Sequence, residues 1–320
     1  MKVAITDYEY ANIDIERKIF AAAGIELYDY QCKNEKELIA ATYDKDGVIV
    51  QYCPMTSNVI KKLQHCKIIV KYGIGVDNID ISAATAKNIF VCNVPDYGVE
   101  EVANHTMTFL LALARKLPAL CSIVRKGDFG YKKAVPIKRL SLCTLGLLGF
   151  GRIPQLVCKR ARAFGMRVLT YDPYVKPEII TKAGAELVDR DTLLRESDYI
   201  SCHCPLTEET FHSINATTIS KMKTGACLIN TARGGIICEK DLVVALKEGK
   251  LAGAALDVFE REPLPLNSEL RGLPNVIITG HCAWYTEEAI TTLQHKAAEE
   301  VVRVLRGSLP LNLINCELLK

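Results

Sequence analysis

Short apolar runs rich in β-branched residues alternate along this chain with stretches whose apolar residues recur at helical spacing. In the first hundred residues the strand-like runs are 3–5, 48–51 and 68–70, and the helical stretches are 13–23, 35–41 and 56–63. Alternation of this kind is typical of parallel strands joined by crossover helices. The pattern therefore predicts an α/β fold.

A second series of the same kind begins at residue 142. Its strand-like runs are 142–148, 167–171, 199–202, 226–230, 252–257 and 276–279, and its helical stretches include 152–164 and 239–248. A final helical stretch, 286–305, places Leu293, Ala297 and Val301 on one face, which we expect to be buried.

A long helix expected at 99–116 separates the two series. Its run FLLAL is apolar nearly all round, which predicts burial in the core or in a subunit contact. We predict a first domain of residues 1–98, a second of 99–284, and a C-terminal helix within 285–320 that returns to the first. The return is expected because an enzyme that closes like a hinge needs two connections.

Composition excludes several classes of protein. The 320 residues are 49% apolar, which excludes disorder over most of the length and suits about two domains. Forty Lys and Arg against 37 Asp and Glu leave a charge of +3 with no basic block, so no nucleic-acid partner is expected. The longest nearly pure apolar run, 140–150, is too short to span a membrane, which takes about 20 residues.

The N-terminus and the cysteines predict a cytoplasmic protein with reduced thiols. Asp7 and Glu9 interrupt the segment where a signal peptide needs an apolar core. The 13 cysteines are odd in number, and none are spaced as C-x-x-C. The triplet Cys202-His203-Cys204 is not expected to bind metal, because alternate strand residues face opposite sides and no second ligand pair follows. We predict no metal site.

A glycine-rich turn, GFGRIP, follows the strand expected at 142–148 and opens a helix. Asp172 ends the next strand, 21 residues after Gly151. This order of strand, turn, helix, strand and acid is that of a dinucleotide site. Gly149 allows the tight turn, Gly151 lets the backbone approach the pyrophosphate, and the helix N-terminus attracts it.

Asp172 and Pro154 refine this prediction. Asp172 is expected to accept hydrogen bonds from both ribose hydroxyls and to repel a 2′-phosphate, which favours NAD over NADP. Pro154 replaces the third glycine of the pattern, whose role is helix–strand packing. Proline is tolerated in a first helical turn, so the substitution weakens the pattern without abolishing it.

Three later segments are polar directly after apolar strands. They read NTARGG from residue 230, DVFEREP from residue 257 and GHCAWY from residue 280. Ligands of open α/β sheets bind beyond the carboxyl ends of the strands. We therefore expect an arginine, a glutamate and a histidine to converge there.

With these segments in order, the sequence resembles the NAD-dependent D-isomer-specific 2-hydroxyacid dehydrogenases over nearly its whole length. The matching segments are KYGIGVDNIDISAA, NVPDYGVEEVANHT, GFGRI, YDPY, CPLTEETFHSIN, INTARGG, ALDVFEREPLP and GHCAWY. The resemblance implies two doubly wound parallel-sheet domains with a cleft between them. These are a flavodoxin-like substrate domain (1–98 plus 285–320) and a Rossmann dinucleotide-binding domain (99–284).

The resemblance also implies an oxidoreductase that transfers a hydride between NAD(H) and a 2-ketoacid/D-2-hydroxyacid pair. Arg233 would bind the substrate carboxylate and polarise its C2 oxygen. His281 would be the general acid or base, and Glu262 would hold its tautomer and favour the imidazolium form. Glu260 is the rival partner for His281, and the resemblance favours Glu262 because it immediately precedes Pro263.

The other implied site residues contact cofactor or substrate. Asp257 would meet the nicotinamide amide, and Thr231 and Pro205 would flank the cofactor. The implied cofactor-binding residues are Gly149, Gly151, Arg152, Ile153, Asp172, Pro205, Thr210, Thr231, Ala232, Asp257 and Ala283. The implied substrate-binding residues are Tyr52, Lys71, Trp284, and Ile74 and Gly75 through their backbone N–H groups.

Departures from the family pattern leave alternatives open. Lys71 stands where many relatives carry arginine, which keeps the charge but loses the planar fork.

GHCAWY resembles the C-terminal-binding-protein-like corepressors, in which the tryptophan forms a wall of the substrate pocket. Packing in the core is the alternative for Trp284. A second function therefore stays open, an NAD(H)-sensing interaction protein with little turnover. We expect a homodimer that forms through the helix at 99–116.

Overall fold

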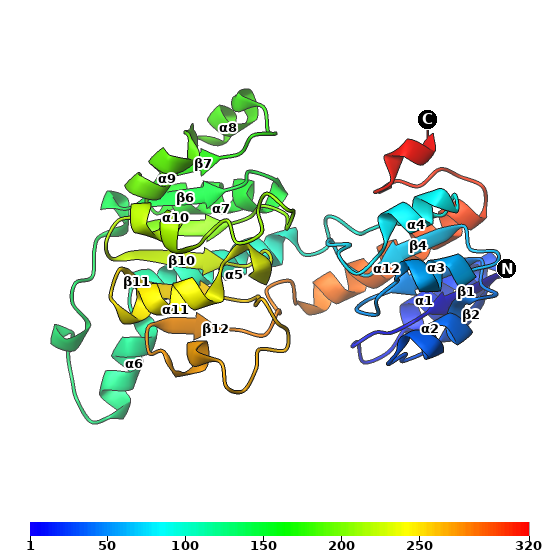
Figure 1. Cartoon of the computed structure of the whole chain (residues 1–320), viewed down its shortest axis with the longest axis horizontal. Helices are drawn as coiled ribbons and strands as arrows, with labels where there is room; N and C mark the ends of the chain where they lie inside the picture. Colours follow the sequence, from blue (N-terminus) through cyan, green and yellow to red (C-terminus); the bar gives the residue numbers. More distant parts are fainter. Residues whose placement is uncertain (320) are drawn as a thin grey trace. The chain divides into compact units, whose positions relative to one another are not determined.

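The computed structural model describes residues 1–319 as two compact units (Figure 1). The first unit contains residues 1–98 and the segment from Tyr285 onward, and the second contains Val99–Trp284. The chain therefore leaves the first unit once and returns to it with its last long helix. Each unit is built on its own parallel sheet.

The first unit has a five-stranded parallel sheet in the order β2-β1-β3-β4-β5, the flavodoxin-like order. Its strands are β1 (Lys2–Ile5), β2 (Glu26–Asp29), β3 (Gly47–Val50), β4 (Ile68–Lys71) and β5 (Phe90–Cys92). Its helices are α1 (Asp14–Ala23), α2 (Glu35–Thr42), α3 (Ser57–Lys62), α4 (Ile81–Ala86) and α12 (Glu287–Leu305).

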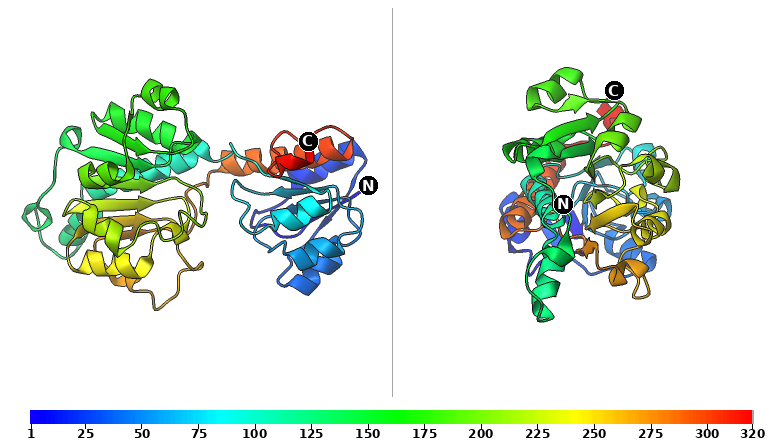
Figure 2. Two further views of the ribbon diagram at one scale, coloured as in Figure 1. Left: turned by 45° about the horizontal axis from the view of Figure 1, so that its top comes forward. Right: turned by 90° about the vertical axis from the view of Figure 1, so that its left-hand side faces the viewer.

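Helix α12 packs beside α1 and against β3 and β4, as the orange and blue ribbons of the first unit show (Figure 2). Leu293, Ala297 and Val301 are at most 1% exposed, so the predicted apolar face is the buried one. Thr286 caps the helix by accepting a hydrogen bond from the backbone N–H of Ala289 (3.0 Å). The last helix is thus an integral layer of the first unit.

The second unit has a seven-stranded parallel sheet in the order β12-β11-β10-β9-β6-β7-β8. Its strands are β6 (Thr144–Leu148), β7 (Arg167–Tyr171), β8 (Glu186–Leu187), β9 (Tyr199–Cys202), β10 (Ala226–Asn230), β11 (Leu251–Leu256) and β12 (Val276–Ile278). Its helices are α5 (Val99–Ala114), α6 (Leu117–Arg125), α7 (Arg152–Ala163), α8 (Pro177–Ala183), α9 (Arg190–Glu196), α10 (Ala216–Lys221) and α11 (Glu239–Lys247). The order reverses between β6 and β9, which makes the sheet doubly wound and confirms the predicted fold class.

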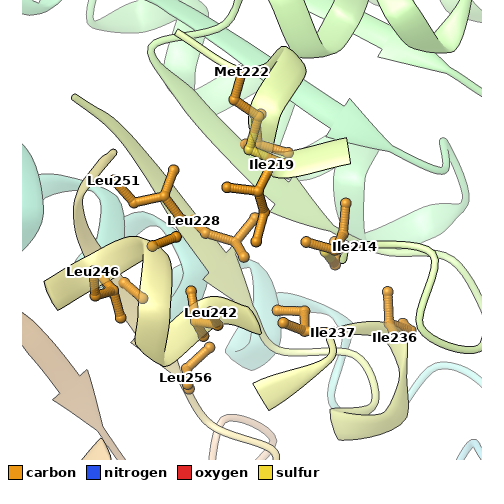
Figure 3. Close-up of a cluster of buried hydrophobic side chains, with 14 of the residues drawn as sticks. Ile214, Ile219, Met222, Leu228, Ile236, Ile237, Leu242, Leu246, Leu251 and Leu256 are labelled. Atoms are coloured by element: carbon orange, nitrogen blue, oxygen red, sulfur yellow. The ribbon is translucent and has the colours of Figure 1, made fainter. Parts of the chain in front are cut away.

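Helices cover both faces of this second sheet, so its central strands are buried throughout. Helices α5 and α7 pack together on one face, and α9, α10 and α11 cover the other. Figure 3 shows the core on the face covered by α9, α10 and α11, where side chains of α10 and α11 meet those of β10 and β11. Continuous burial explains why these strands read as unbroken apolar runs.

Helix α5 ends at Ala114, two residues before the predicted end, because Lys116 adopts a left-handed conformation (φ 48°). Its apolar character reflects burial within its own unit, since Phe109 and Leu110 are at most 3% exposed. Within residues 1–319 no single helix is both long and apolar enough to cross a membrane. Only the pair α5 and α6, bent by 57°, reaches that length and apolarity together.

One strand starts later than predicted. Residues Leu140–Leu142 form a 3-10 turn, and β6 begins at Thr144. Leu142 is 80% exposed, so its apolar side chain belongs to the surface and not to the strand. The sequence pattern predicted a strand from Leu142 because this residue is apolar, although it lies before the first hydrogen-bonded residue of β6.

Candidate active site

The glycine turn lies at the carboxyl end of β6, beside the point where the strand order reverses. Gly149 has φ 96°, and a Cβ there would meet the backbone of His203 and Cys204 at 3.0 Å. A Cβ on Gly151 would meet nothing within 4 Å, and no side chain caps the start of α7. Open space over uncapped N–H groups fits a dinucleotide pyrophosphate. Pro154 is buried in the first turn of α7 without breaking it.

Asp172 follows β7 and lies against this turn. Its Oδ2 accepts a hydrogen bond from the backbone N–H of Phe150 (2.7 Å). Its Oδ1 accepts from Tyr174 (2.8 Å) and Val175 (2.9 Å). The carboxylate therefore joins two adjacent strand ends, in addition to the ribose contact that the sequence predicts for it.

The loop after β9 carries Pro205 and Thr210 and is closed by its own side chains. The Thr210 hydroxyl donates to the carbonyl of Pro205 (2.6 Å) and accepts from the backbone N–H of Thr207 (2.7 Å). Before this loop, His203 bonds Ser201 Oγ through Nε2 (2.9 Å), and burial lowers the pKa of His203 to about 3. The ring of His203 is therefore uncharged at neutral pH.

Arg233, Glu262 and His281 follow three neighbouring strands, β10, β11 and β12. The Nδ1 of His281 lies 2.7 Å from Oε2 of Glu262. Oε1 of Glu262 accepts from the backbone N–H of Phe259 (3.0 Å). Burial opposes ionisation of Glu262, but its hydrogen bond to His281 and the charge on that ring hold its pKa below the usual value.

Glu260, the rival partner, lies elsewhere. Its Oε1 accepts from the backbone N–H of Glu239 (2.7 Å) and lies 3.1 Å from Nε2 of His212. The cis peptide bond between Glu262 and Pro263 follows the glutamate that pairs with His281. Of the two glutamates, the structure therefore brings Glu262 to the imidazole.

Asp257 holds the His281 loop in place. The backbone N–H of His281 donates to the Asp257 carbonyl (2.7 Å). The Asp257 carboxylate, 1% exposed, accepts from the N–H groups of Cys282 (3.0 Å) and Ala283 (2.9 Å) and from the Thr279 hydroxyl. Sequence reasoning placed Asp257 at the nicotinamide and missed this loop-binding role.

Trp284 is tied to the same loop. Its indole Nε1 donates to the backbone carbonyl of His281 (3.0 Å). His281 itself has φ 54°, a conformation that few residues other than glycine adopt. The left-handed turn at His281 is therefore held on one side by Asp257 and on the other by Trp284.

Arg233 is positioned by two residues that sequence reasoning did not select. Asn230 accepts from the N–H of Ala232 (3.0 Å) and donates to the carbonyl of Arg233 (2.9 Å). A Cβ on Gly234 would overlap the backbone of Phe259, so the Arg233 loop and the Glu262 loop are in direct contact. The two glycines after Arg233 were the signal for such a close approach.

The predicted substrate-binding residues of the first unit lie at the carboxyl end of β4 or in the loops after the adjacent strands β3 and β4. Tyr52 is 56% exposed and donates to Oε1 of Glu9 (2.7 Å). Lys71 Nζ lies 5.6 Å from the centre of the Tyr52 ring. Within residues 1–319, no backbone carbonyl accepts a hydrogen bond from the N–H of Ile74 or Gly75, as a carboxylate-binding loop requires.

Comparison with known proteins places this geometry in a family. Residues 107–283 match the model of the D-isomer specific 2-hydroxyacid dehydrogenase, NAD binding domain. D-3-phosphoglycerate dehydrogenase of Methanocaldococcus jannaschii is 44% identical over 283 residues, which cover 88% of this chain and 54% of that protein. This chain thus spans about half the length of that relative.

Two further comparisons cover most of both chains. Glyoxylate reductase of Thermococcus litoralis is 42% identical over 261 residues, 79% of this chain and 78% of that protein. The crystal structure of D-lactate dehydrogenase from Aquifex aeolicus, complexed with NAD and lactic acid, superposes with a TM-score of 0.88 at 31% identity. It covers 98% of both chains.

Replacing Asp257 by asparagine is expected to destabilise the second unit by about 1–3 kcal/mol. The amide group that replaces one carboxylate oxygen cannot accept a hydrogen bond, so a buried N–H or O–H group loses its acceptor. Urea unfolding followed by fluorescence measures the change. Asp191→Asn, at an exposed site of the same unit, is the control, and equal stabilities for the two variants would contradict the role given to Asp257.

Proposed function

This chain belongs to the D-isomer specific 2-hydroxyacid dehydrogenase family, and we propose that it transfers a hydride between NAD(H) and a 2-ketoacid/D-2-hydroxyacid pair. One observation carries the proposal. Arg233 and the hydrogen-bonded pair Glu262–His281 follow adjacent strands, at the same sheet edge as the glycine turn of an NAD binding domain. A cation, a proton donor and a dinucleotide turn are the groups that ketoacid reduction needs.

Arg233 binds the substrate carboxylate in this proposal and polarises the C2 oxygen, because a guanidinium offers parallel donors to a planar acid. Glu262 accepts from Nδ1 of His281, which leaves Nε2 to give a proton to the C2 oxygen in reduction or to take it in oxidation. NAD(H), when bound, accepts or supplies the hydride.

The residues that hold the cofactor surround the turn and the neighbouring strand ends. Gly149, Gly151, Arg152 and Ile153 hold the pyrophosphate by their backbone. Asp172 accepts from the ribose hydroxyls. The remaining proposed contacts come from the loops after β9 to β12, namely Pro205, Thr210, Thr231, Ala232, Asp257 and Ala283.

The substrate is a small 2-ketoacid or 2-hydroxyacid in this proposal, and Tyr52, Lys71, Ile74, Gly75 and Trp284 recognise it. Relatives named for glyoxylate and lactate support a small acid. Lys71 supplies a charge to the carboxylate without the fork of an arginine. The thirteen cysteines, all free thiols, support a reducing cytoplasmic location.

The second candidate, an NAD(H)-sensing protein of the corepressor type, is favoured by GHCAWY alone. The indole of Trp284 donates to the backbone carbonyl of His281, so this segment holds the backbone of the residue proposed as the acid. A sensor needs no proton donor, whereas the chain carries a complete Arg, Glu and His set. We therefore favour the enzyme.

Arg233→Ala and His281→Asn are each expected to lower kcat/KM by at least about a hundredfold while NADH binding persists, because both residues act on the reacting acid. Arg233→Lys keeps the positive charge but removes the parallel N–H donors, so it tests whether the planar guanidinium is required. The measurement is NADH oxidation with glyoxylate, pyruvate, hydroxypyruvate and longer 2-ketoacids. Arg306→Ala and His65→Gln, both on the surface, are the matched controls.

Near-normal rates in both variants would contradict the residue roles. Failure of the unaltered protein to oxidise NADH with any ketoacid, together with micromolar NADH binding, would favour the sensor.

Asp172→Asn is expected to raise the ratio of kcat/KM with NADPH to that with NADH by at least about tenfold, because the variant loses a charge that repels the 2′-phosphate. The asparagine carbonyl still accepts from Tyr174 and Val175. Glu178→Gln, in the first turn of α8, is the control of equal charge change. An unchanged ratio would show that Asp172 does not select the cofactor.

A homodimer is the assembly that we propose. Helix α5, the predicted contact, buries most of its apolar face within its own unit, and exposed apolar side chains follow it. Helix α6 buries none of its residues, and its Val124 is 56% exposed, while Phe129 and Leu142 beyond it are 97% and 80% exposed. Light scattering is expected to give twice the chain mass, and Phe129→Asp to shift that mass toward the monomer; a monomer before substitution contradicts the proposal.

A further inference from the structure

Three side chains with metal-binding atoms meet on three consecutive strand-end loops of the second unit. They are His212 after β9, Cys238 after β10 and Glu260 after β11. One ligand atom of each lies within 4.8 Å of the other two. We propose that these three residues form a Zn²⁺ site. It lies apart from the Cys202-His203-Cys204 triplet, and it does not depend on the proposed reaction.

The imidazole of His212 is held before any metal binds. Its ring stacks on Phe211 with centroids 4.0 Å apart. Its backbone N–H donates to Gly235 (2.8 Å), and its carbonyl accepts from the side chain of Asn215 (2.8 Å). Its φ of 46° is left-handed, a backbone conformation that costs free energy for a residue other than glycine. The surrounding contacts therefore hold this ring in place.

Cys238 occupies the N-cap position of α11, where a side chain ordinarily accepts a hydrogen bond from the first helical turn. The Cys238 side chain makes no such bond. Its backbone N–H donates to Ile214 (2.8 Å), and the neighbouring residues Ile214 and Ile237 belong to the buried core of Figure 3. The backbone that carries the Cys238 sulfur is therefore fixed against the core. The sulfur makes no N-cap hydrogen bond that metal binding would have to break.

Glu260 is fixed by a reciprocal pair of hydrogen bonds with Glu239. The N–H of Glu260 donates to Oε1 of Glu239, and the N–H of Glu239 donates to Oε1 of Glu260, both at 2.7 Å. This pair joins the start of α11 to the loop that carries Glu262. The three ligands are thus preorganised by different backbone contacts.

The contact between His212 and Glu260 brings two potential metal-binding atoms together. Nε2 of His212 is buried and lies 3.1 Å from Oε1 of Glu260, yet it forms no hydrogen bond in the described chain. In the tautomer whose proton is on Nδ1, Nε2 carries a lone pair that a cation can bind, and the same cation would neutralise the carboxylate. Two ligands of one tetrahedral Zn²⁺ lie about 3.3–3.8 Å apart, because each bond is about 2.0–2.3 Å long.

The donor set selects the class of ion. A thiolate, an imidazole and a carboxylate suit Zn²⁺, whereas Mg²⁺ and Ca²⁺ prefer oxygen ligands alone. The side chains of His212 and Glu260 are 33% and 35% exposed, so an ion can enter from solvent and a water can complete the tetrahedron. On binding, the Cys238 thiol releases its proton to solvent and the sulfur forms the metal bond.

A bound ion would act as a clamp on the strand-end loops. Glu260 is two residues from Glu262, and the reciprocal pair with Glu239 carries the constraint to α11. The proposed ligands include neither His281 nor Arg233, so the role of the ion would be to position the Glu262 loop.

The test is zinc titration of the full chain after chelator treatment, followed by calorimetry with ZnCl₂ alone. One Zn²⁺ per chain is expected, and Cys238→Ser and His212→Asn should each weaken its binding at least about tenfold. Asparagine tolerates the left-handed backbone at 212. Cys282→Ser, which removes the exposed thiol beside His281, should leave the affinity unchanged.

Cobalt substitution gives a second, spectroscopic readout. Co²⁺ bound to the unaltered chain should show thiolate-to-metal charge transfer, which Cys238→Ser abolishes and Cys282→Ser retains. Circular dichroism checks that each variant folds. The proposal is overturned if zinc does not saturate, if Cys238→Ser and His212→Asn bind it as the unaltered chain does, or if only Cys282→Ser loses it.

Discussion

The parallel register of β10, β11 and β12 is the constraint on which the rest of the site depends. Asn230 pairs with Leu256, and Leu256 pairs with Ile278, so three strands end side by side. Each chain segment then leaves the sheet at the same edge. A slip of one residue would move every side chain of a strand to the opposite face of the sheet, where it would have to pack against different helices. Shared register therefore converts three distant sequence segments into neighbours.

Buried polar side chains convert that proximity into fixed positions. Asp257 and Asn230 are each 1% exposed. Asp257 accepts hydrogen bonds from the backbone of the His281 loop, and Asn230 bonds the backbone of the Arg233 loop. A buried carboxylate or amide is costly unless it is fully bonded, so the loops cannot easily adopt other shapes. The functional side chains of these loops are thus supported by a rigid inner layer. Preorganisation of this kind is what electrostatic catalysis requires.

The same loops present two different sets of side chains. Glu262 contacts His281, whereas Glu260, two residues earlier, faces His212 and the start of α11. Gly234 allows the neighbouring loop to pack against the backbone at Phe259 and Glu260. The segment from Glu260 to Glu262 therefore connects the proposed proton donor to the proposed zinc site. A change at Glu260 or at Glu262 would act on the backbone that both residues share.

The sequence by itself determined the fold class, the glycine turn and the candidate Arg, Glu and His, because strand and helix periodicities and turn residues are local properties of the chain. The family resemblance favoured Glu262 over Glu260 as the partner of His281, but local pattern could not separate two glutamates two residues apart, and the loop geometry is what brings Glu262 to that ring. Only the tertiary structure decided that Asp257 binds the His281 loop, that Lys116 ends α5, and that His212, Cys238 and Glu260 meet. These contacts join residues far apart in the chain, and packing sets them where no local pattern can.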